Sequence, residues 1–172
     1  MKKYSIKLIT ITALFTSLIC LITYYPKIFI LGGYIHVGDS IILFAASVLG
    51  PVPGAFAGAV GSSLADLFAG FTFYAPFTFV IKGLLGLFIG AMAKKASKRP
   101  YVYAGIGAIW VVCGYFIADC IYYTFINNNA DTGLVEALWF ILWNSLQGLV
   151  SASIYLFLFP RLRKVIKKYS SY

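Results

Sequence analysis

The sequence predicts an all-α membrane protein, a bundle of six transmembrane helices with both the N- and C-termini in the cytoplasm. Of its 172 residues, 61% are hydrophobic and only 11% are charged, which is too little polar surface for a soluble domain of this size. The apolar residues form long runs that are separated by Gly, Pro, Asn and basic residues. Most basic residues fall in three short clusters at the ends of these runs. We therefore expect lipid around most of the chain.

The hydrophobic runs define the expected helices. Crossing about 30 Å of hydrocarbon takes about 20 residues, so the second and third runs are short, and we expect those helices to be tilted or shielded by neighbours. The first run resembles a signal peptide, but Ile19 is too bulky before Cys20 for lipoprotein cleavage, so we expect an uncleaved helix. One transmembrane domain is expected over residues 1–172, with helices near 6–24, 38–50, 54–70, 76–93, 101–126 and 134–160.

The basic residues predict the orientation. Six crossings place the three clusters on one side of the membrane, which the positive-inside rule identifies as the cytoplasm. The LGPVPG motif marks a tight turn on the same side. The two remaining basic residues are Lys27, in the first outer loop, and Lys82, inside a helix. The clusters are Lys2, Lys3 and Lys7; Lys94, Lys95, Lys98 and Arg99; and Arg161, Arg163, Lys164, Lys167 and Lys168.

Polar side chains inside the expected helices indicate a ligand site, because such groups are costly in hydrocarbon. Five such residues occur, namely Asp66, Lys82, Asp119, Asn144 and Gln147, and the first four lie at or above the membrane midplane. Asp119 lies between Tyr115 and Tyr123 on one helix face, since the three are spaced four residues apart. Gln147 follows Trp139 and Trp143 at the same spacing, with Asn144 on the adjoining edge. We interpret these stripes as the walls of a cavity that stacks a flat ring and bonds its edges.

Two further polar pairs have competing interpretations. Asp66 and Lys82 lie near the outer ends of successive helices, so they are expected to be close enough to pair. There are two interpretations of such a pair: its side chains contact a ligand, or it is a structural salt bridge that touches no ligand. His36 and Asp39 lie in the first outer loop, where we expect Asp39 to cap the next helix. His36 is a candidate for closing over a ligand.

The same residues argue against an enzyme. His36 is the only histidine in the sequence, and it lies in a loop, so the helix-borne serine and histidine of an intramembrane serine protease are missing. The HExxH motif of metalloproteases is absent, and Asp66 and Asp119 lie in no recognisable aspartyl protease motif. Cys20, Cys113 and Cys120 lie in apolar segments and form no CxxC pair. We expect no catalytic residues, no metal site and no cofactor.

Several segments together resemble the substrate-binding (S) components of energy-coupling factor (ECF) transporters. The resemblance extends from residue 6 to about residue 165, and residues 33–90 are its most specific part. The most similar group is the vitamin-type S components associated with riboflavin, hydroxymethylpyrimidine or pyridoxine. The segments that carry it are GGYIHVGDS, LGPVPGAFAG, the SSLADL run that ends at Gly70, YAPFT and KGLLG.

The resemblance implies a binding subunit that captures its cargo outside and works with a membrane coupling protein (T component) and two cytoplasmic ATPases. The family docks through an AxxxA patch on the first helix, which corresponds here to Ala13 and Ser17, with serine in place of the second alanine. Family binding sites use the first outer loop and helices four to six. That region coincides with the expected cavity. The substrate-binding candidates in it are His36, Lys82, Tyr115, Asp119, Trp143, Asn144 and Gln147.

The expected function is ATP-driven vitamin import across the bacterial cell membrane. A carboxylate with amides suits a small neutral or weakly basic heterocycle, such as pyridoxine or a hydroxymethylpyrimidine. Riboflavin and a queuosine-precursor-type (deazapurine) base remain alternative ligands. A self-contained secondary carrier is the alternative mechanism, although the sequence lacks the internal repeats that such carriers usually have.

Overall fold

The computed structural model describes residues 5–25, 28–30, 33–95 and 99–169, with the side chains of 29, 30, 33, 95 and 162–169 left aside. Lys2, Lys3, Lys27 and Lys98 therefore lie outside the described residues. The described chain forms six helices and one short hairpin. These elements are α1 (Ile6–Tyr24), β1 (Ile28–Ile30), β2 (Gly33–Ile35), α2 (Gly38–Leu49), α3 (Pro51–Ala69), α4 (Tyr74–Lys95), α5 (Pro100–Asn127) and α6 (Ala130–Tyr169).

The all-helical class and the six expected helices are confirmed. Five helices in the described chain are long and apolar enough to span a membrane, and the sixth, α2, has 12 residues. At 1.5 Å per residue, α2 is about 18 Å long, which is shorter than the hydrocarbon core. Most of α2 is buried between α1, α3, α4 and α6. Its neighbours thus shield the short helix, as its length predicted.

Glycine and proline set the boundaries at both ends of α3. Gly50 has a φ of 92° and separates α2 from α3, and Pro51 occupies the first turn of α3. The proline loses nothing there, because the first amides of a helix have no partner within the helix. Gly70 ends α3 with a φ of 85° in the left-handed region, which glycine adopts without steric cost. The turn predicted at LGPVPG is therefore made by Gly50, with both prolines inside the next helix.

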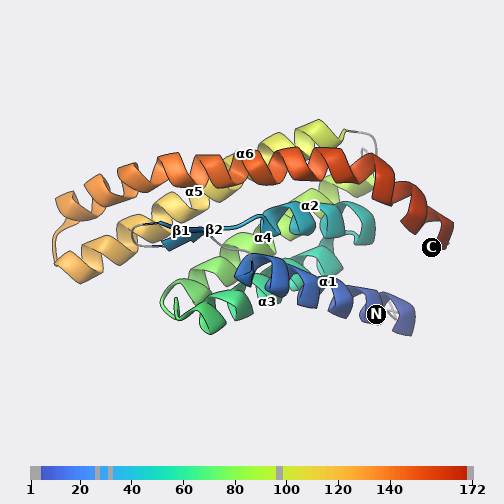
Figure 1. Ribbon diagram of the computed structural model, residues 1–172, viewed down its shortest axis with the longest axis horizontal. Helices are drawn as coiled ribbons and strands as arrows, with labels where there is room; N and C mark the ends of the chain where they lie inside the picture. Colours follow the sequence, from blue (N-terminus) through green and yellow to red (C-terminus); the bar gives the residue numbers. More distant parts are fainter. Residues whose placement is uncertain (1–4, 26–27, 31–32, 96–98, 170–172) are drawn as a thin grey trace.

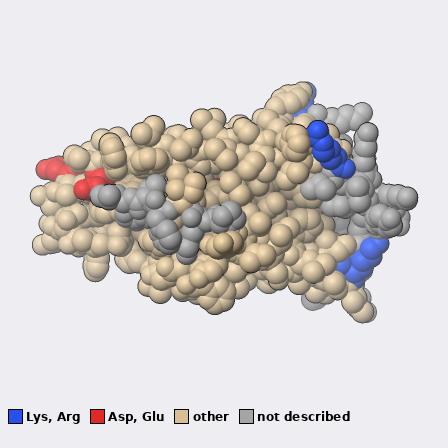
Figure 2. All heavy atoms as spheres, viewed as in Figure 1, with Lys and Arg blue, Asp and Glu red and all other residues tan. Residues whose placement is uncertain are grey.

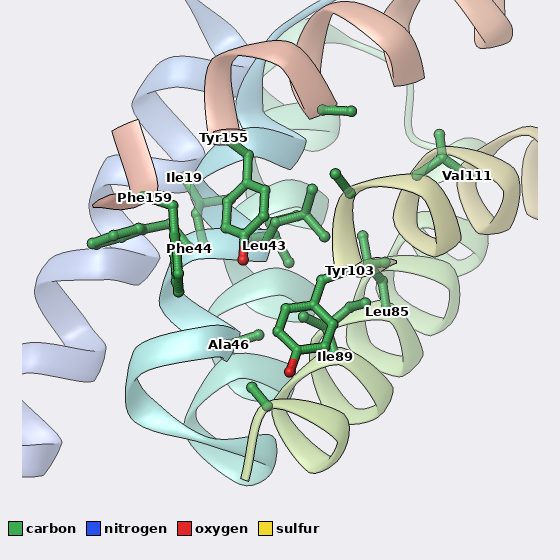
Figure 3. Close-up of a cluster of buried hydrophobic side chains, with 14 of the residues drawn as sticks. Ile19, Leu43, Phe44, Ala46, Leu85, Ile89, Tyr103, Val111, Tyr155 and Phe159 are labelled. Atoms are coloured by element: carbon green, nitrogen blue, oxygen red, sulfur yellow. The ribbon is translucent and has the colours of Figure 1, made fainter. Parts of the chain in front are cut away.

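The helices pack mainly as two pairs, α3 with α4 and α5 with α6, while α1 lies against α3. Figure 1 shows α5 and α6 as a long antiparallel pair along one side of the molecule. Buried side chains from α1, α2, α4, α5 and α6 meet in one hydrophobic cluster near the middle. Figure 3 shows Tyr155 and Phe159 of α6 on the same side of this cluster as Phe44 of α2, with Tyr103 of α5 near Ile89 of α4.

The α3–α4 contact depends on glycine. A Cβ atom added to Gly86 would lie 2.3 Å from the carbonyl oxygen of Gly54, and one added to Gly58 would lie 2.7 Å from the carbonyl oxygen of Lys82. Backbones approach this closely only where one partner has no side chain. The glycines spaced four residues apart on these helices thus form an interface within the bundle.

Two elements differ from the sequence prediction. Residues expected to form only an outer loop include an antiparallel hairpin, in which Ile28 pairs with Ile35 and Phe29 with Tyr34. The last helix was expected to end near residue 160, but α6 continues through Pro160 to Tyr169. Proline removes one backbone donor and disfavours a helix interior. The side chain of Arg161 donates to the carbonyl of Phe157 at 2.6 Å beside this break.

The charged residues divide between the two ends of the bundle. Lysine and arginine side chains gather at the end where α1 begins and α4 ends, and acidic side chains lie at the opposite end (Figure 2). We name these the basic end and the acidic end. The described members of the basic clusters include Lys7, Lys94, Arg99 and Arg161. This separation is what the predicted orientation requires, although the side of the membrane on which each end lies stays a prediction.

Candidate functional site: a polar cavity at the acidic end

A cavity of about 70 Å³ lies at the acidic end, where the hairpin meets the ends of α3 to α6. Its walls combine aromatic rings, carboxylates, amides and the single histidine. The space is several times what one water molecule needs. The lining residues are Tyr34, His36, Asp66, Phe71, Tyr74, Tyr115, Asp119, Phe140, Asn144 and Gln147.

Asp119 is the polar centre of the α4–α5–α6 wall. Its Oδ1 accepts a hydrogen bond from the Tyr74 hydroxyl at 2.8 Å, and its Oδ2 accepts one from Asn144 Nδ2 at 3.2 Å. The Asp119 side chain is only 4% exposed. Each oxygen of a carboxylate can accept further hydrogen bonds, so Asp119 retains capacity for a ligand donor. The wall is also aromatic, since Phe140 stacks on Tyr123 with ring centroids 5.4 Å apart.

Asp66 forms a second carboxylate centre on the opposite wall. Its Oδ1 accepts a hydrogen bond from the Tyr34 hydroxyl at 2.6 Å. Its Oδ2 is buried and has no hydrogen-bond partner among the described residues. Burial and the nearby Asp66 carboxylate raise the pKa of Tyr34, which keeps its phenol protonated as a donor. A buried acceptor without a partner is costly, so this oxygen is suited to a ligand donor or an ordered water.

Lys82 lies behind the cavity wall and pairs with Asp39. Its Nζ is 2.6 Å from Asp39 Oδ1, and Gln147 Nε2 donates to Asp39 Oδ2 at 3.1 Å. The ammonium also lies 4.7 Å from the centre of the Tyr115 ring. Tyr115 itself lines the cavity. Lys82 is fully buried, with 0% of its side chain exposed. This ion pair joins α2, α4 and α6 beneath the site.

Two sequence interpretations are wrong here. Lys82 was expected to pair with Asp66, but its partner is Asp39. Asp39 was expected to cap the second helix, but the residue at that position is Val37, and no side chain caps the helix. Asp39 instead lies inside the first turn and is 2% exposed. The buried Asp39 carboxylate is therefore neutralised by Lys82, whereas a capping carboxylate would have faced solvent.

His36 is held as a neutral imidazole between β2 and α2. Its Nδ1 accepts a hydrogen bond from the backbone N–H of Gly38 at 3.1 Å, so the ring proton lies on Nε2. Burial lowers the pKa of His36 to about 4, and the small contributions of Asp39 and Lys82 oppose each other. The His36 backbone N–H also donates to Gln147 Oε1 at 3.3 Å. These bonds fix the hairpin segment onto α6 at the cavity rim.

Five of the seven predicted substrate-binding residues line one cavity: His36, Tyr115, Asp119, Asn144 and Gln147. Lys82 lies behind the wall, and Trp143 is not among the lining residues. Trp139, which shares the predicted stripe with Trp143, is 56% exposed. Trp143 is partly buried, and neither tryptophan lines the cavity. Whether the five residues contact a ligand stays a prediction.

Sequence reasoning did not select Tyr34, Asp66, Phe71, Tyr74 or Phe140, which also line the cavity. A signal existed for Phe140, because it precedes Asn144 by four residues and Gln147 by seven, which places the three on one helix face. Asp66 was recognised as a costly intramembrane carboxylate but was assigned to the wrong partner. The remaining residues lie in or beside loops, where helical periodicity carries no information.

The residues that the structure describes contain no group of three or more His, Cys, Asp or Glu side chains placed to hold a metal ion. What the site offers instead is carboxylate and amide acceptors, tyrosine and imidazole donors, and ring faces. The fold and the site together define a membrane-embedded helical bundle with a small polar cavity at one end, which is the form of a ligand-binding subunit.

Comparison with known proteins identifies the family. The model of the ECF-type riboflavin transporter S-component family matches residues 3–164, and the chain belongs to this family. The resemblance drawn from the sequence is thereby confirmed. The family is a substrate-binding transporter component and not an enzyme family.

A solved structure shares the fold. The chain is similar to the S component for biotin of an ECF-type ABC transporter, with a TM-score of 0.63, 20% sequence identity and alignment over 92% of each chain. A relative from Pyrococcus woesei, described as an uncharacterized protein in gap 3' region, is 41% identical over 85 residues. That alignment spans 48% of this chain and 57% of the relative, so just over half of the relative is matched.

Proposed function

We propose that this chain is the substrate-binding subunit of an ECF importer for a small, flat heterocyclic vitamin that is neutral or cationic. The observation that carries the proposal is the pairing of two buried carboxylates, Asp66 and Asp119, in one cavity whose described lining contains no lysine or arginine. Family membership supplies the general role. The cavity chemistry narrows the class of ligand.

The electrostatics of the site favour donors and disfavour anions. Asp66 and Asp119 both line the cavity, and Asp66 Oδ2 has no hydrogen-bond partner among the described residues. Lys82 cannot offset them toward a ligand, because its charge is engaged by Asp39 at 2.6 Å. A ligand carboxylate or phosphate would face like charge in a low-dielectric space, which is strongly unfavourable. Hydroxyl, amino and protonated ring groups fit these acceptors.

Cavity size favours a single ring. Sites for small molecules usually enclose about 300–1,000 Å³, and this cavity encloses about 70 Å³. Pyridoxine or a hydroxymethylpyrimidine requires less expansion than a three-ring ligand. Riboflavin is the second candidate, because the family whose model matches the chain is named for riboflavin transport. Binding riboflavin here requires the hairpin or the α5–α6 pair to move outward.

A ligand panel tests the ligand class. The purified protein is titrated calorimetrically with pyridoxine, hydroxymethylpyrimidine and riboflavin, and with the phosphate esters of each. We expect one unphosphorylated compound to bind and its phosphate ester to bind at least tenfold more weakly, a difference of about 1.4 kcal/mol. Mass spectrometry of any copurifying small molecule identifies the ligand independently. A clear preference for an anionic vitamin or ester contradicts the proposal.

The proposed partners are a T component and two cytoplasmic ATPases in the bacterial cell membrane, with the basic end of the bundle inside. Ala13 and Ser17 support a docking role, because both are exposed one turn apart on α1, and the Ser17 hydroxyl is directed to the Ala13 carbonyl at 3.1 Å. Because both side chains are small, the backbone of another helix can approach α1 closely at this place.

Transport in liposomes distinguishes an ECF subunit from a self-contained carrier. With the partner subunits and ATP present, we expect uptake that stops when ATP is withheld. The chain alone is expected to bind ligand without accumulating it. Accumulation by the chain alone, driven by a proton gradient and insensitive to ATP, would establish a secondary carrier instead.

A further inference from the structure

A second hollow, here named the α4–α5 groove, lies apart from the ligand cavity. It has a volume of about 290 Å³ and is lined only by apolar residues: Leu85, Phe88, Ile89, Ala91, Met92, Ile106 and Trp110. These residues belong to the half of α4 and of α5 that is nearer the basic end, since α4 ends at Lys95 and α5 begins at Pro100. The groove arises because α5 packs mainly on α6 and much less on α4.

A hydrogen bond holds the groove at the end where Trp110 lies, and the groove is open at its side. Trp110 Nε1 donates to the backbone carbonyl of Ile81 at 2.9 Å, which fixes the indole between the two helices. Phe88 packs edge-on against it with ring centroids 5.2 Å apart. Phe88, Ala91 and Ile106 are exposed at the surface of the bundle. A molecule in the surrounding lipid can therefore enter laterally.

The dimensions of the groove suit one hydrocarbon chain. Leu85 and Met92 are seven residues apart, which corresponds to roughly 10 Å along the helix axis at about 1.5 Å per residue. A volume of about 290 Å³ over that length leaves a mean cross-section on the order of 30 Å². An extended acyl chain, a single row of methylene groups, is narrow enough to lie in the groove along this length.

Positive charge lies where the headgroup of such a lipid would be. Arg99 is exposed and is the N-cap residue of α5, so it lies at the end of the helix from which Ile106 and Trp110 follow. Lys94, also exposed, lies at the end of α4 on the far side of the connection. The chain between the two helices is basic throughout, with Lys94, Lys95, Lys98 and Arg99 within six residues.

We propose that the α4–α5 groove binds an anionic glycerophospholipid, with one acyl chain between α4 and α5 and the phosphate at Arg99. A lipid in the leaflet at the basic end has the required direction, because its headgroup lies at the membrane surface and its chains run toward the midplane. The groove likewise runs from the charged connection toward Trp110. The lipid fills the gap that α4 and α5 leave between them and joins the α5–α6 pair to the rest of the bundle.

Native mass spectrometry tests the proposal. The protein is reconstituted in nanodiscs of equimolar phosphatidylglycerol and phosphatidylcholine with identical chains, then released into detergent. We expect one phosphatidylglycerol to remain bound, with a preference of about fivefold over phosphatidylcholine for each basic residue near the headgroup, because the choline ammonium of phosphatidylcholine offsets its phosphate charge. Arg99→Gln is expected to lose the preference. Ala91→Leu, which fills the groove from an exposed position, is expected to lose retention of both lipids.

Matched controls separate a specific site from general lipid contact. Arg161→Gln removes a basic residue at the same end of the bundle but on α6, and Val80→Leu enlarges an exposed apolar residue on α4 outside the groove. Both variants are expected to retain phosphatidylglycerol as the parent protein does. Equal retention of the two lipids by the parent protein, or unchanged retention in Arg99→Gln and Ala91→Leu, contradicts the proposal.

A photo-crosslinking residue at position 106 identifies the occupant directly. In cells, an adduct of phospholipid mass supports the proposal, and an adduct with a protein shows that a partner occupies the groove instead. Calorimetric titration with the vitamin ligand is expected to be unaffected by Ala91→Leu. That result also shows that the variant is folded.

Discussion

At the scale of single residues, the ligand cavity depends on which carboxylates remain available. Three buried aspartates lie in the acidic half of the bundle, and each has a different environment. Asp39 pairs with Lys82 and Gln147 and does not line the cavity. Asp119 accepts from Tyr74 and Asn144, and Asp66 accepts from Tyr34 through one oxygen. Asp39 is therefore structural, and the other two face the cavity. The predictions at this scale follow from that division.

Asp119→Asn tests the ligand role. The amide keeps the shape of the side chain but loses the charge and one acceptor, so a ligand donor loses a charge-assisted hydrogen bond of about 1.5–3 kcal/mol. We expect ligand affinity to fall by roughly tenfold to a hundredfold, measured by calorimetry, with membrane insertion unchanged. Glu136→Gln is the control, since Glu136 lies on α6 near the same end and does not line the cavity. Equal affinity in the Asp119 variant removes this residue from the site.

Lys82→Met tests the structural role of the buried ion pair. Removal of Lys82 leaves Asp39 as an uncompensated charge in a site where both side chains are at most 2% exposed. Breaking one partner of such a pair costs about 3–5 kcal/mol. We expect a clear loss of thermal stability in detergent and partial recovery in the double variant Lys82→Met/Asp39→Leu. Equal stability of the single variant and the parent protein would contradict this account.

His36 predicts a pH dependence of stability. Its pKa is lowered by burial from 6.5 to about 4 in the folded protein, so the unfolded chain binds the proton more tightly. The stability is complete above pH 6.5 and is lost as the pH falls toward 4. From pH 7.5 to pH 5 the loss due to this group is about 2 kcal/mol. Because His36 is the only histidine, His36→Gln should remove this loss from the unfolding profile between these pH values, and an unchanged profile would show that the imidazole is not buried.

At the scale of elements, sequence reasoning succeeded where hydrophobic length and helical periodicity decide the outcome. Helix boundaries near residues 6, 24, 38 and 70 follow from runs that end at polar, glycine or proline residues. The hairpin of β1 and β2 was not predicted, because strands of three residues carry no readable alternation. The Asp39–Lys82 pair was missed for a related reason. Depth along a helix can be read from sequence, but the direction in which α2 faces its four neighbours cannot.

Gly86→Ala tests the close contact between α3 and α4. The added Cβ would meet the Gly54 carbonyl oxygen at 2.3 Å, and backbone atoms cannot move aside as a flexible side chain can. Overpacking of this kind costs about 1–3 kcal/mol, which we expect as a lower midpoint of thermal unfolding. Gly105→Ala is the matched control, since an added Cβ there meets nothing within 4 Å. Its higher helix propensity should raise stability by up to about 1 kcal/mol. Similar effects at the two sites would argue against a tight α3–α4 interface.

At the scale of the whole molecule, the charges, the cavity and the exposed small residues each occupy a distinct end or face of the bundle. The cavity lies at the acidic end, the α4–α5 groove lies in the half of these helices nearer the basic end, and Ala13 and Ser17 are exposed on α1. The proposed ligand site and the proposed docking site therefore lie on different surfaces. This separation predicts that a change on one surface should leave the function of the other intact.

Ala13→Leu tests the separation. A larger side chain at this exposed position prevents a partner helix from approaching closely, and it lies far from every residue that lines the cavity. We expect ligand affinity in detergent to be unchanged and ATP-dependent uptake with the partner subunits to be largely lost. Leu18→Phe is the control, because it adds volume to a different exposed edge of α1 and should permit uptake. If uptake survives Ala13→Leu, the docking surface lies elsewhere on the bundle. If ligand binding also falls, the two surfaces are coupled through α1, because α1 packs on α3, the helix that carries Asp66.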